Sequence, residues 1–291
     1  MKRILHITFL LSVLLLSCTK QAPAPKEDIV REGYTLLPAN IETLLLDKEH
    51  ARTWEESAAI GVFGSTQGQN EKYRLRSADA HLSRGEFYGP LVKGATIAAY
   101  YPFTPSFAGS AESLSGSLSG VQSFFADKDA PAQFLTYCPT AFAFLENGQL
   151  PFHYPCGLLK VTVGLDETLT VRSISLTDAV HPLAGPMSVT RSGAVLDSAS
   201  GTNTLSLNCE AGIPTKDSSG NFQPFYLVML AGDYADITLE LRIDEEASPI
   251  VCQVKSLRIP RITTKDFQIG AITVQSGGPD SFEPVNVHFD E

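Results

Sequence analysis

Short apolar runs with a period of two recur along this chain, and they restrict it to folds built from β-strands. In the clearest run, between Asp236 and Asp244, aliphatic side chains alternate strictly with charged or hydroxyl side chains. Successive side chains of a strand point to opposite faces of its sheet, so this pattern predicts one buried face and one wet face. Residues 225–230 are apolar throughout, which predicts a strand covered on both faces. Further strand signals lie at 60–63, 97–101, 159–165 and 272–274.

The composition supplies enough apolar material for packed sheets but offers no surface for nucleic acid. Apolar residues make up 43% of the 291 residues, and the formal net charge at pH 7 is −10. Negative charge repels a phosphate backbone, and no basic stripe with interleaved aromatic residues offsets it. The frequent turns and the length favour an all-β fold of two domains. We predict an N-terminal β-sandwich over 34–165 and a C-terminal β-sandwich over 166–291.

The first 17 residues have the organisation of a secretory signal peptide. Two basic residues precede an apolar run that ends at Ser17, too short and too early for an ordinary membrane span. Removing 1–17 takes both basic residues away, so the formal charge of the mature chain becomes −12. Ser17 before Cys18, with leucines upstream, resembles the lipobox of bacterial lipoproteins, which implies a lipidated Cys18. Residues 18–33 are then a lipid-anchored tether. The alternative is a plain signal peptide with a chance cysteine.

Four cysteines remain when Cys18 is set aside, and an even number permits disulfides outside the cytoplasm. Cys209 and Cys252 lie on the apolar faces of two predicted strands, so both thiols should point into a common core and we pair them. Cys138 is then paired with Cys156. Buried free thiols that act as small hydrophobic side chains are the alternative. No metal site is expected, because no CxxC motif occurs and no histidine stands at ligand spacing from these cysteines.

One short motif raises the question of an enzyme. Gly116–Gly120, with the sequence Gly-Ser-Leu-Ser-Gly, comes close to the G-x-S-x-G pattern of hydrolases but has Leu118 where that pattern has its serine. That motif needs a strand before the serine and a helix after it, whereas residues 106–120 are rich in serine and glycine and predict a flexible surface loop. No acid/base pair or phosphate loop is recognisable elsewhere, so we expect neither catalysis nor a cofactor.

An ordered set of short landmarks runs from the first half of the chain into the second. They are Trp54, Ile60–Phe63, Asn70, Tyr73, Tyr100–Phe103, Leu150, Phe152–His153, Leu159–Leu165, Ser173–Leu176 and Leu183–Gly185. Together with the lipobox, their order and spacing resemble the fimbrillin family, the major and accessory subunits of type V pili of anaerobic Gram-negative bacteria. Each landmark is weak alone, and the match extends from about residue 34 to the C-terminus.

The resemblance implies two tandem transthyretin-like β-sandwiches that form a subunit of a cell-surface fimbria. It implies assembly by strand exchange with other fimbrial subunits, in which a strand of one subunit completes the groove of the next. In polymerising members an arginine-specific protease removes the first strand, and the arginines beside that segment here are Arg31 and Arg52. The chain is shorter than typical stalk subunits, so an accessory, tip or anchor role fits it as well. The implied location is the outer membrane or cell surface, with an unidentified surface ligand.

The C-terminus carries a last alternating run. After a break at Gly277–Pro279, Val285, Val287 and Phe289 alternate with polar residues, as in a strand with one apolar face. A terminal strand behind a flexible break suits insertion into the open groove of a neighbouring subunit. The alternative is a last strand that packs on its own domain.

A lipid-anchored, glycan-binding β-sandwich of a nutrient-capture system is the alternative function. Such sites usually present a flat row of exposed aromatic rings. The residues that would supply the row are Phe124, Phe125, Tyr137 and Phe144, although core packing competes for the same side chains.

Overall fold

A computed structural model describes residues 32–41, 52–126, 129–165, 167–243, 248–261, 270–278 and 281–285. Strands dominate this part of the chain, which confirms the predicted all-β class. The helical elements are α1 (Ala130–Tyr137) and the single 3₁₀ turn η1 (Ser77–Asp79). The strands are β1 (Tyr34–Ile41), β2 (Ala59–Gly64), β3 (Gln67–Leu75), β4 (Arg84–Pro90), β5 (Ile97–Tyr101), β6 (Ser113–Leu118), β7 (Val121–Ser123), β8 (Ala141–Phe144), β9 (Leu150–Phe152), β10 (Cys156–Val163), β11 (Thr170–Thr177), β12 (Gly185–Thr190), β13 (Gly193–Leu196), β14 (Thr204–Pro214), β15 (Pro224–Leu230), β16 (Gly232–Ile243), β17 (Ile250–Ile259), β18 (Gly270–Gly278) and β19 (Ser281–Val285).

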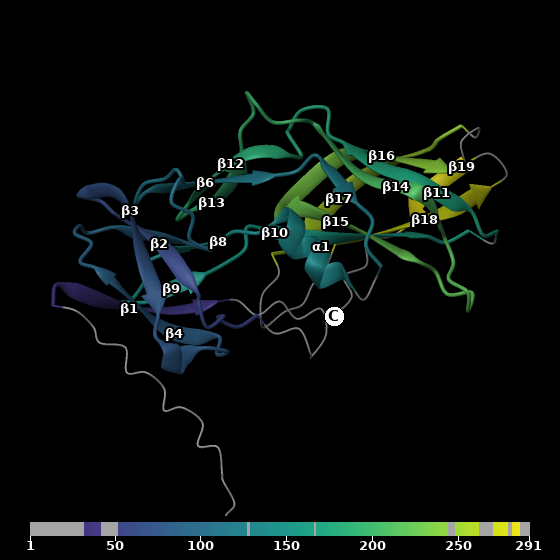
Figure 1. The fold of residues 1–291 in the computed structure, drawn as a ribbon. Coiled ribbons are helices and arrows are strands. Elements are labelled where there is room, and N and C mark those ends of the chain that lie inside the picture. The colour runs from purple at the N-terminus through teal and green to yellow at the C-terminus, as the bar shows by residue number, and fades with distance from the viewer. Residues whose placement is uncertain are drawn as a thin grey trace, which may run out of the picture.

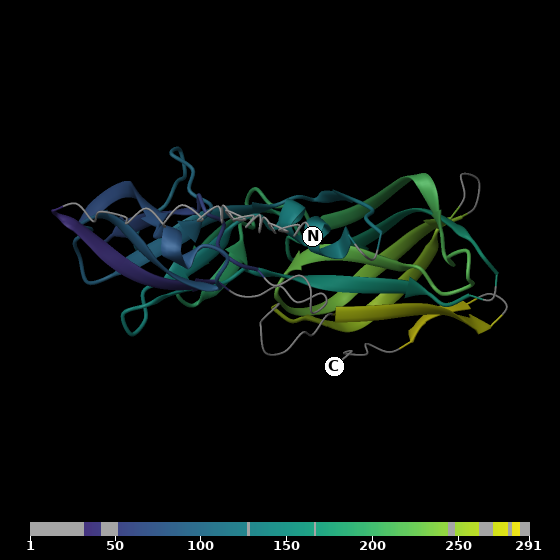
Figure 2. The ribbon, with the colours of Figure 1, turned by 60° about the horizontal axis from the view of Figure 1, so that its bottom comes forward.

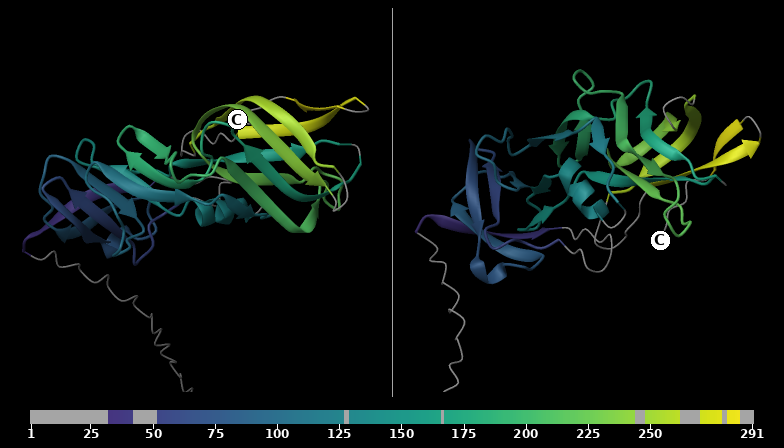
Figure 3. Two further views of the ribbon diagram at one scale, coloured as in Figure 1. Left: turned by 90° about the horizontal axis from the view of Figure 1, so that it is seen from above. Right: turned by 45° about the vertical axis from the view of Figure 1, so that its right-hand side comes forward.

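The strands form two lobes that lie side by side along one axis (Figures 1 and 2). The N-terminal lobe contains a seven-stranded sheet in the order β8-β5-β2-β3-β4-β1-β9 and a three-stranded sheet, β13-β12-β6. The C-terminal lobe contains a four-stranded sheet, β15-β10-β18-β19, and a five-stranded sheet, β17-β16-β11-β14-β7. In the further views of Figure 3, the last two strands lie at the edge of the C-terminal lobe. Sheets packed around an apolar core are the architecture of a β-sandwich.

The change from one lobe to the other does not occur at the predicted position. β10 pairs with β15 and β18 of the C-terminal lobe, so the predicted boundary between 165 and 166 falls one strand too late. β6 pairs with β12 in the N-terminal lobe, and β7 pairs with β14 in the C-terminal lobe. The chain therefore crosses between the lobes more than once. A boundary chosen from domain length and a turn signal does not detect strands that leave a lobe and return.

The serine- and glycine-rich segment 106–120 is not the flexible loop that its composition predicts. Its second half is β6, which pairs antiparallel with β12 along its whole length. Leu114 and Leu118 of this strand are buried at 0% and 2% exposure, and they tie the segment to the core. Residues 116–118 of the hydrolase-like run stand on the strand itself, away from the strand-to-helix turn on which a hydrolase carries its nucleophile.

Burial in the C-terminal lobe follows the predicted alternation. On β16, Ile237, Leu239 and Leu241 are fully buried. Asp236 and Arg242, which flank this set in the sequence, are exposed. β15 is buried along nearly its whole length, as predicted for a strand covered on both faces. Apolar side chains at every second residue of a strand therefore contribute to the core of this lobe, as the local sequence pattern predicts.

Three side chains close the outer edge of β15, the end strand of its sheet. Gln122 of β7 donates to the Val228 carbonyl at 2.7 Å and accepts from the Val228 N–H at 2.9 Å. Gln133 of α1 donates to the carbonyl two residues before Val228 at 2.5 Å, and the Tyr234 hydroxyl donates to the carbonyl two residues after it at 2.7 Å. Because alternate residues of a strand direct their backbone groups to the same side, these bonds pair the edge as a further strand would.

Candidate functional site

The candidate site for assembly is the place of the first strand in the seven-stranded sheet. β1 pairs antiparallel with β4 over Tyr34–Asn40 and parallel with β9 over Ala39–Ile41. The strands at the two ends of the sheet order, β8 and β9, are joined by an antiparallel bridge between Phe142 and His153. The sheet therefore wraps round and meets itself, and β1 occupies a slot with a strand on each side.

β1 presents one apolar face to the interior and one face to solvent. Leu37, Ala39 and Ile41 alternate along it and are 8%, 4% and 2% exposed. Tyr34 and Leu36 point outward and are each 37% exposed. If β1 left, β4 and β9 would expose unpaired backbone groups along an apolar slot. Such a slot accepts a strand of the same alternation, because backbone hydrogen bonds give affinity and alternate side chains fill the pockets.

The core beneath this slot is aromatic and is centred on Trp54, which follows β1 in the chain. Trp54 is fully buried. Its ring meets those of Phe87, Tyr101 and Phe152 edge to face, with centroids 4.8, 5.2 and 5.5 Å apart, a favourable geometry for aromatic pairs. The backbone N–H of Trp54 donates to the Leu82 carbonyl at 2.9 Å. Trp54 therefore packs against aromatic rings of β4, β5 and β9, at a position that follows β1 in the chain.

Of the two predicted cleavage positions, Arg52 is described and Arg31 lies outside the described residues. The Arg52 guanidinium lies over the ring of Tyr101, 5.6 Å from its centre. Burial raises the pKa of the Tyr154 hydroxyl to about 12, and the nearby Arg52 guanidinium acts in the opposite direction. A cut after Arg52 would separate β1 from the lobe, whereas a cut after Arg31 would leave β1 attached. A protease must draw the Arg52 side chain out of these contacts before it can cut there.

The C-terminal strand pairs with its own lobe as far as it is described. β19 runs antiparallel to β18, with Val285 opposite Thr273. β19 is the last strand in the order of its sheet, so among the described residues one of its edges has no strand partner. Val285 is thus placed at the end of a strand, whereas Val287 and Phe289, the other predicted donor residues, lie outside the described residues.

The four predicted disulfide cysteines are buried thiols without a disulfide bond in the structure. Cys209 on β14 and Cys252 on β17 belong to one sheet, in which β11 and β16 lie between them. Strands in a sheet are spaced about 4.8 Å apart, so three spacings place the two Cα atoms at least roughly 14 Å apart. This is about twice the longest separation, roughly 7 Å, that a disulfide bridges. The predicted Cys209–Cys252 disulfide is wrong, because alternation identified the buried face but not the order of the strands.

Cys138 and Cys156, by contrast, lie against each other. Cys138 follows α1 directly, and Cys156 is the first residue of β10. A hydrogen bond with the Cys138 thiol, together with complete burial, raises the pKa of the Cys156 thiol well above its usual value. The structure therefore brings this predicted pair together, and the bond between them stays a prediction.

The aromatic residues expected for a flat glycan platform do not form an exposed row. Phe144 is buried, and the Arg191 guanidinium covers its ring at 5.8 Å from the centre. The ring of Phe124 packs against an aromatic ring of β15, with 5.6 Å between the centroids. The Tyr137 hydroxyl accepts a hydrogen bond from a backbone N–H of β7 at 2.6 Å. None of the four residues is strongly exposed, because Phe124, Phe125 and Tyr137 are half-buried and Phe144 is buried. The exposed aromatic row that the glycan-binding alternative needs is therefore not formed by these residues.

In the described part of the chain, no three histidine, cysteine, aspartate or glutamate residues gather in a group that could hold a metal ion. Neither helical element in the described ranges is long and apolar enough to cross a membrane.

Known proteins share the fold of this chain rather than its sequence. No family model matches the sequence, and no curated protein matches it. A proposed cell adhesion protein from Bacteroides ovatus is 14% identical with a TM-score of 0.50, covering 87% of this chain and 96% of its own. Another from Bacteroides uniformis is 16% identical with a TM-score of 0.50, covering 89% of this chain and 99% of its own. A fimbrial protein from Bacteroides vulgatus is 10% identical with a TM-score of 0.48, covering 88% of this chain and 98% of its own. The chain thus has the fold of the two proposed cell adhesion proteins over nearly their whole length, in agreement with the fimbrillin resemblance.

Proposed function

We propose that this protein is a structural or adhesive subunit of a bacterial surface fimbria, without catalytic activity. It is exported as a lipoprotein through Cys18, assembled by strand exchange, and placed at an accessory, tip or anchor position at the outer membrane. The fold shared with two proposed cell adhesion proteins supports a role at the cell surface. The other fimbrial subunits are its partners in assembly.

One observation carries the assembly proposal: the slot filled by β1 matches the alternation of the C-terminal run. The buried residues of β1 are Leu37, Ala39 and Ile41, spaced two apart. Val285, Val287 and Phe289 have the same spacing and the same apolar character. Side chains of every strand alternate with a period of two residues. A C-terminal run in this slot would therefore direct its three apolar side chains into the positions that the buried side chains of β1 occupy. In our proposal, β1 leaves one subunit and this run of another subunit enters the slot.

Treatment of the mature protein with an arginine-specific protease tests this proposal. We expect ladders of oligomers that resist SDS without heating, because a strand inserted in a closed sheet is paired on both edges. The substitution R52K should abolish the ladders, since it removes the cut that frees β1. The matched variant R31K should leave them unchanged, since a cut at Arg31 leaves β1 attached.

Two variants of the same assay separate assembly from stability. Removing residues 286–291 should abolish the ladders and leave the melting temperature of the uncut monomer nearly unchanged. Removing 281–291 also takes β19 away, so it should lower the melting temperature as well. Ladders from R52K protein would rule out β1 release as the trigger. Cleaved protein that stays monomeric and is retained on polysaccharide gels would favour the glycan-binding function instead.

Lipid anchoring is tested separately by replacing Cys18. We expect C18A to move the protein from the detergent phase to the aqueous phase in Triton X-114 partition. Each buried CH₂ of an acyl chain contributes about 0.8 kcal/mol, so loss of two or three chains removes all membrane affinity of this kind. The variant C252A keeps the lipid site and serves as the control. Equal partition of C18A and the wild type would contradict the lipoprotein assignment.

A further inference from the structure

β6 is the end strand of the three-stranded sheet, and part of its outer edge has no partner strand. Ser117 of β6 lies opposite Pro186 of β12, and a proline has no N–H to donate across the pair. The backbone N–H and C=O of Ser117 therefore point away from β12, because alternate residues of a strand bond to opposite sides. On that outer side they have no hydrogen-bond partner among the described residues. Ser117 is also exposed, so a further chain can reach these groups.

The preceding residues of β6 show how this edge is paired where the protein covers it. The Ser115 N–H donates to the Ala108 carbonyl at 3.3 Å, and the Ser110 N–H donates to the Ser113 carbonyl at 2.8 Å. Residues 113 and 115 thus direct backbone groups to the same side as residue 117. The segment 108–110 bonds to this edge as far as Ser115, so the groups of Ser117 continue a ladder whose next member is absent from the described chain.

An apolar hollow of about 260 Å³ adjoins the open edge. Ser115, Gly116 and Ser117 form one of its walls. A Cβ atom on Gly116 would lie 2.9 Å from the Met187 side chain and 3.2 Å from the Phe142 ring, so the glycine keeps the wall low beside these two side chains. None of the described residues that line the hollow is charged. Its remaining walls are mostly apolar and include Phe107, Ala108, Cys138, Pro139 and Pro155.

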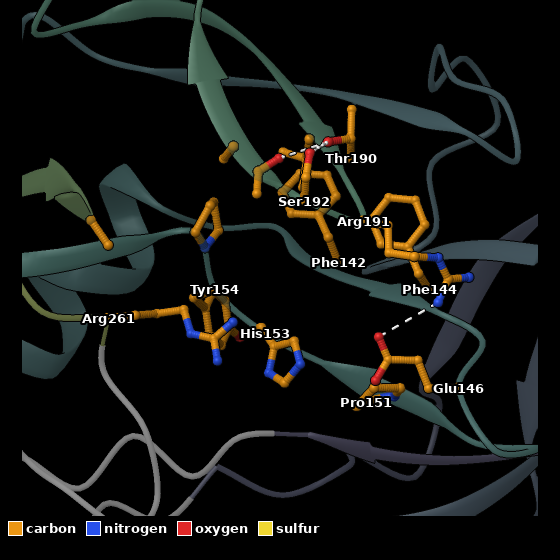
Figure 4. Close-up of a pocket in the computed structure, with 15 residues that line it drawn as sticks. Phe142, Phe144, Glu146, Pro151, His153, Tyr154, Thr190, Arg191, Ser192 and Arg261 are labelled. Atoms are coloured by element: carbon orange, nitrogen blue, oxygen red, sulfur yellow. Dashed lines mark hydrogen bonds and ion pairs between the residues drawn. The ribbon is translucent and has the colours of Figure 1, made fainter.

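Phe142 also borders a second hollow, which is the one drawn in Figure 4. There the Arg191 guanidinium lies 3.5 Å from a Glu146 carboxylate oxygen, so opposite charges already pair at its rim. The hollow beside β6 has no such groups in its described lining. Burying a charge without a partner is costly, so the lining beside β6 favours an uncharged, apolar occupant.

We propose that the β6 edge binds an extended, uncharged peptide segment of another protein chain, with one large apolar side chain of that segment in the hollow. The peptide residue opposite Ser117 exchanges two backbone hydrogen bonds with it. The next peptide residue then faces the same side as Gly116, because side chains alternate, and it enters the hollow. Backbone bonds supply affinity and the hollow selects the side chain, as in other sites built on sheet edges.

The size of the hollow favours a single side chain over a free small molecule. Small-molecule sites usually measure about 300–1,000 Å³, and this hollow is smaller. The open backbone groups of Ser117 also lie at its wall, where a peptide supplies their partners and a purely apolar ligand does not. This surface is separate from the slot of β1 and does not depend on strand exchange there.

Nuclear magnetic resonance titration of the isotope-labelled mature full chain tests the proposal. The probe is the capped peptide acetyl-Thr-Phe-Thr-amide, which we expect to shift the Ser117 amide and the Met187 methyl resonances saturably, with a Kd of about 1 mM. The peptide acetyl-Thr-Ala-Thr-amide lacks the large side chain and should bind at least tenfold more weakly. A third peptide, the phenylalanine peptide methylated on both threonine nitrogens, loses the N–H groups for the edge and should also bind at least tenfold more weakly.

Three variants locate the site on β6. S117P removes the open N–H and should weaken binding of the phenylalanine peptide at least tenfold, and proline is tolerated in an edge strand where the N–H faces outward. The matched variant S117A keeps the backbone groups and should bind like the wild type. A108W places a large side chain at the exposed rim of the hollow and should weaken binding at least tenfold while leaving the open edge intact.

Melting temperatures establish that each variant is folded, and A108W and the methylated peptide decide the question if S117P is not. Equal binding of the alanine and phenylalanine peptides would overturn the role of the hollow. Unchanged binding by folded S117P together with unchanged binding of the methylated peptide would overturn the role of the edge. Absence of saturable shifts at about 10 mM phenylalanine peptide would overturn the site as a whole.

Discussion

Replacing Gln122 by alanine is expected to lower the free energy of unfolding by about 2–6 kcal/mol. Gln122 is fully buried and satisfies both backbone groups of Val228, at 2.7 and 2.9 Å. Its removal leaves a buried N–H and a buried carbonyl without partners, and each such group costs about 1–3 kcal/mol. Urea unfolding followed by far-UV circular dichroism measures the change.

Matched substitutions separate the lost hydrogen bonds from the lost volume. Q122L keeps most of the side-chain volume but pairs neither backbone group, so it should destabilise the protein about as much as Q122A. Q253A removes an exposed glutamine of β17 whose amide donates to the Thr238 hydroxyl at 2.9 Å, and it should change stability by less than about 0.5 kcal/mol. If Q122A behaved like Q253A, the capping of the β15 edge would not matter for stability.

We expect a disulfide between Cys138 and Cys156 to form when the protein folds in an oxidising compartment, and its reduction to lower the free energy of unfolding by about 3 kcal/mol. The estimate follows from the loop of about 19 residues that the bond closes, in the chain-entropy description of cross-links. The two thiols are buried side by side, so a bond needs little movement of the backbone. Non-reducing peptide mapping identifies the bond, and urea unfolding with and without reductant measures its contribution.

The other two cysteines supply the control for this experiment. C209S and C252S should leave the peptide map unchanged, because these residues lie on strands too far apart to be joined. C138S should remove the effect of reductant on stability. Once reduced, the native protein should resist alkylation at Cys156, because its high pKa keeps the thiol protonated and burial excludes the reagent. Two free thiols at these positions in protein from the periplasm would contradict the prediction.

The strands of this protein were predictable where their pattern is local. The alternation on β16 and the continuous apolar run of β15 both matched the observed burial. α1 was not predicted, because an eight-residue helix is too short to show a clear period of 3.6. The proline near its start was the available signal, since proline is common in the first turn of a helix. β6 was missed because small polar residues have a turn-like composition whether or not a neighbouring strand pairs with them.

The sequence by itself determined the fold class, the faces of the clearest strands and the residues that resemble fimbrillin landmarks. Side-chain alternation is a property of a single segment, so it can be read without knowing the neighbours of that segment. Only the tertiary structure decided the strand order, the lobe boundary and the separation of Cys209 from Cys252. It also assigned Gln122 to the edge of β15, although 106 positions separate it from Val228 in the chain. Such pairings depend on the balance of contacts over the whole core, and no local pattern contains that balance.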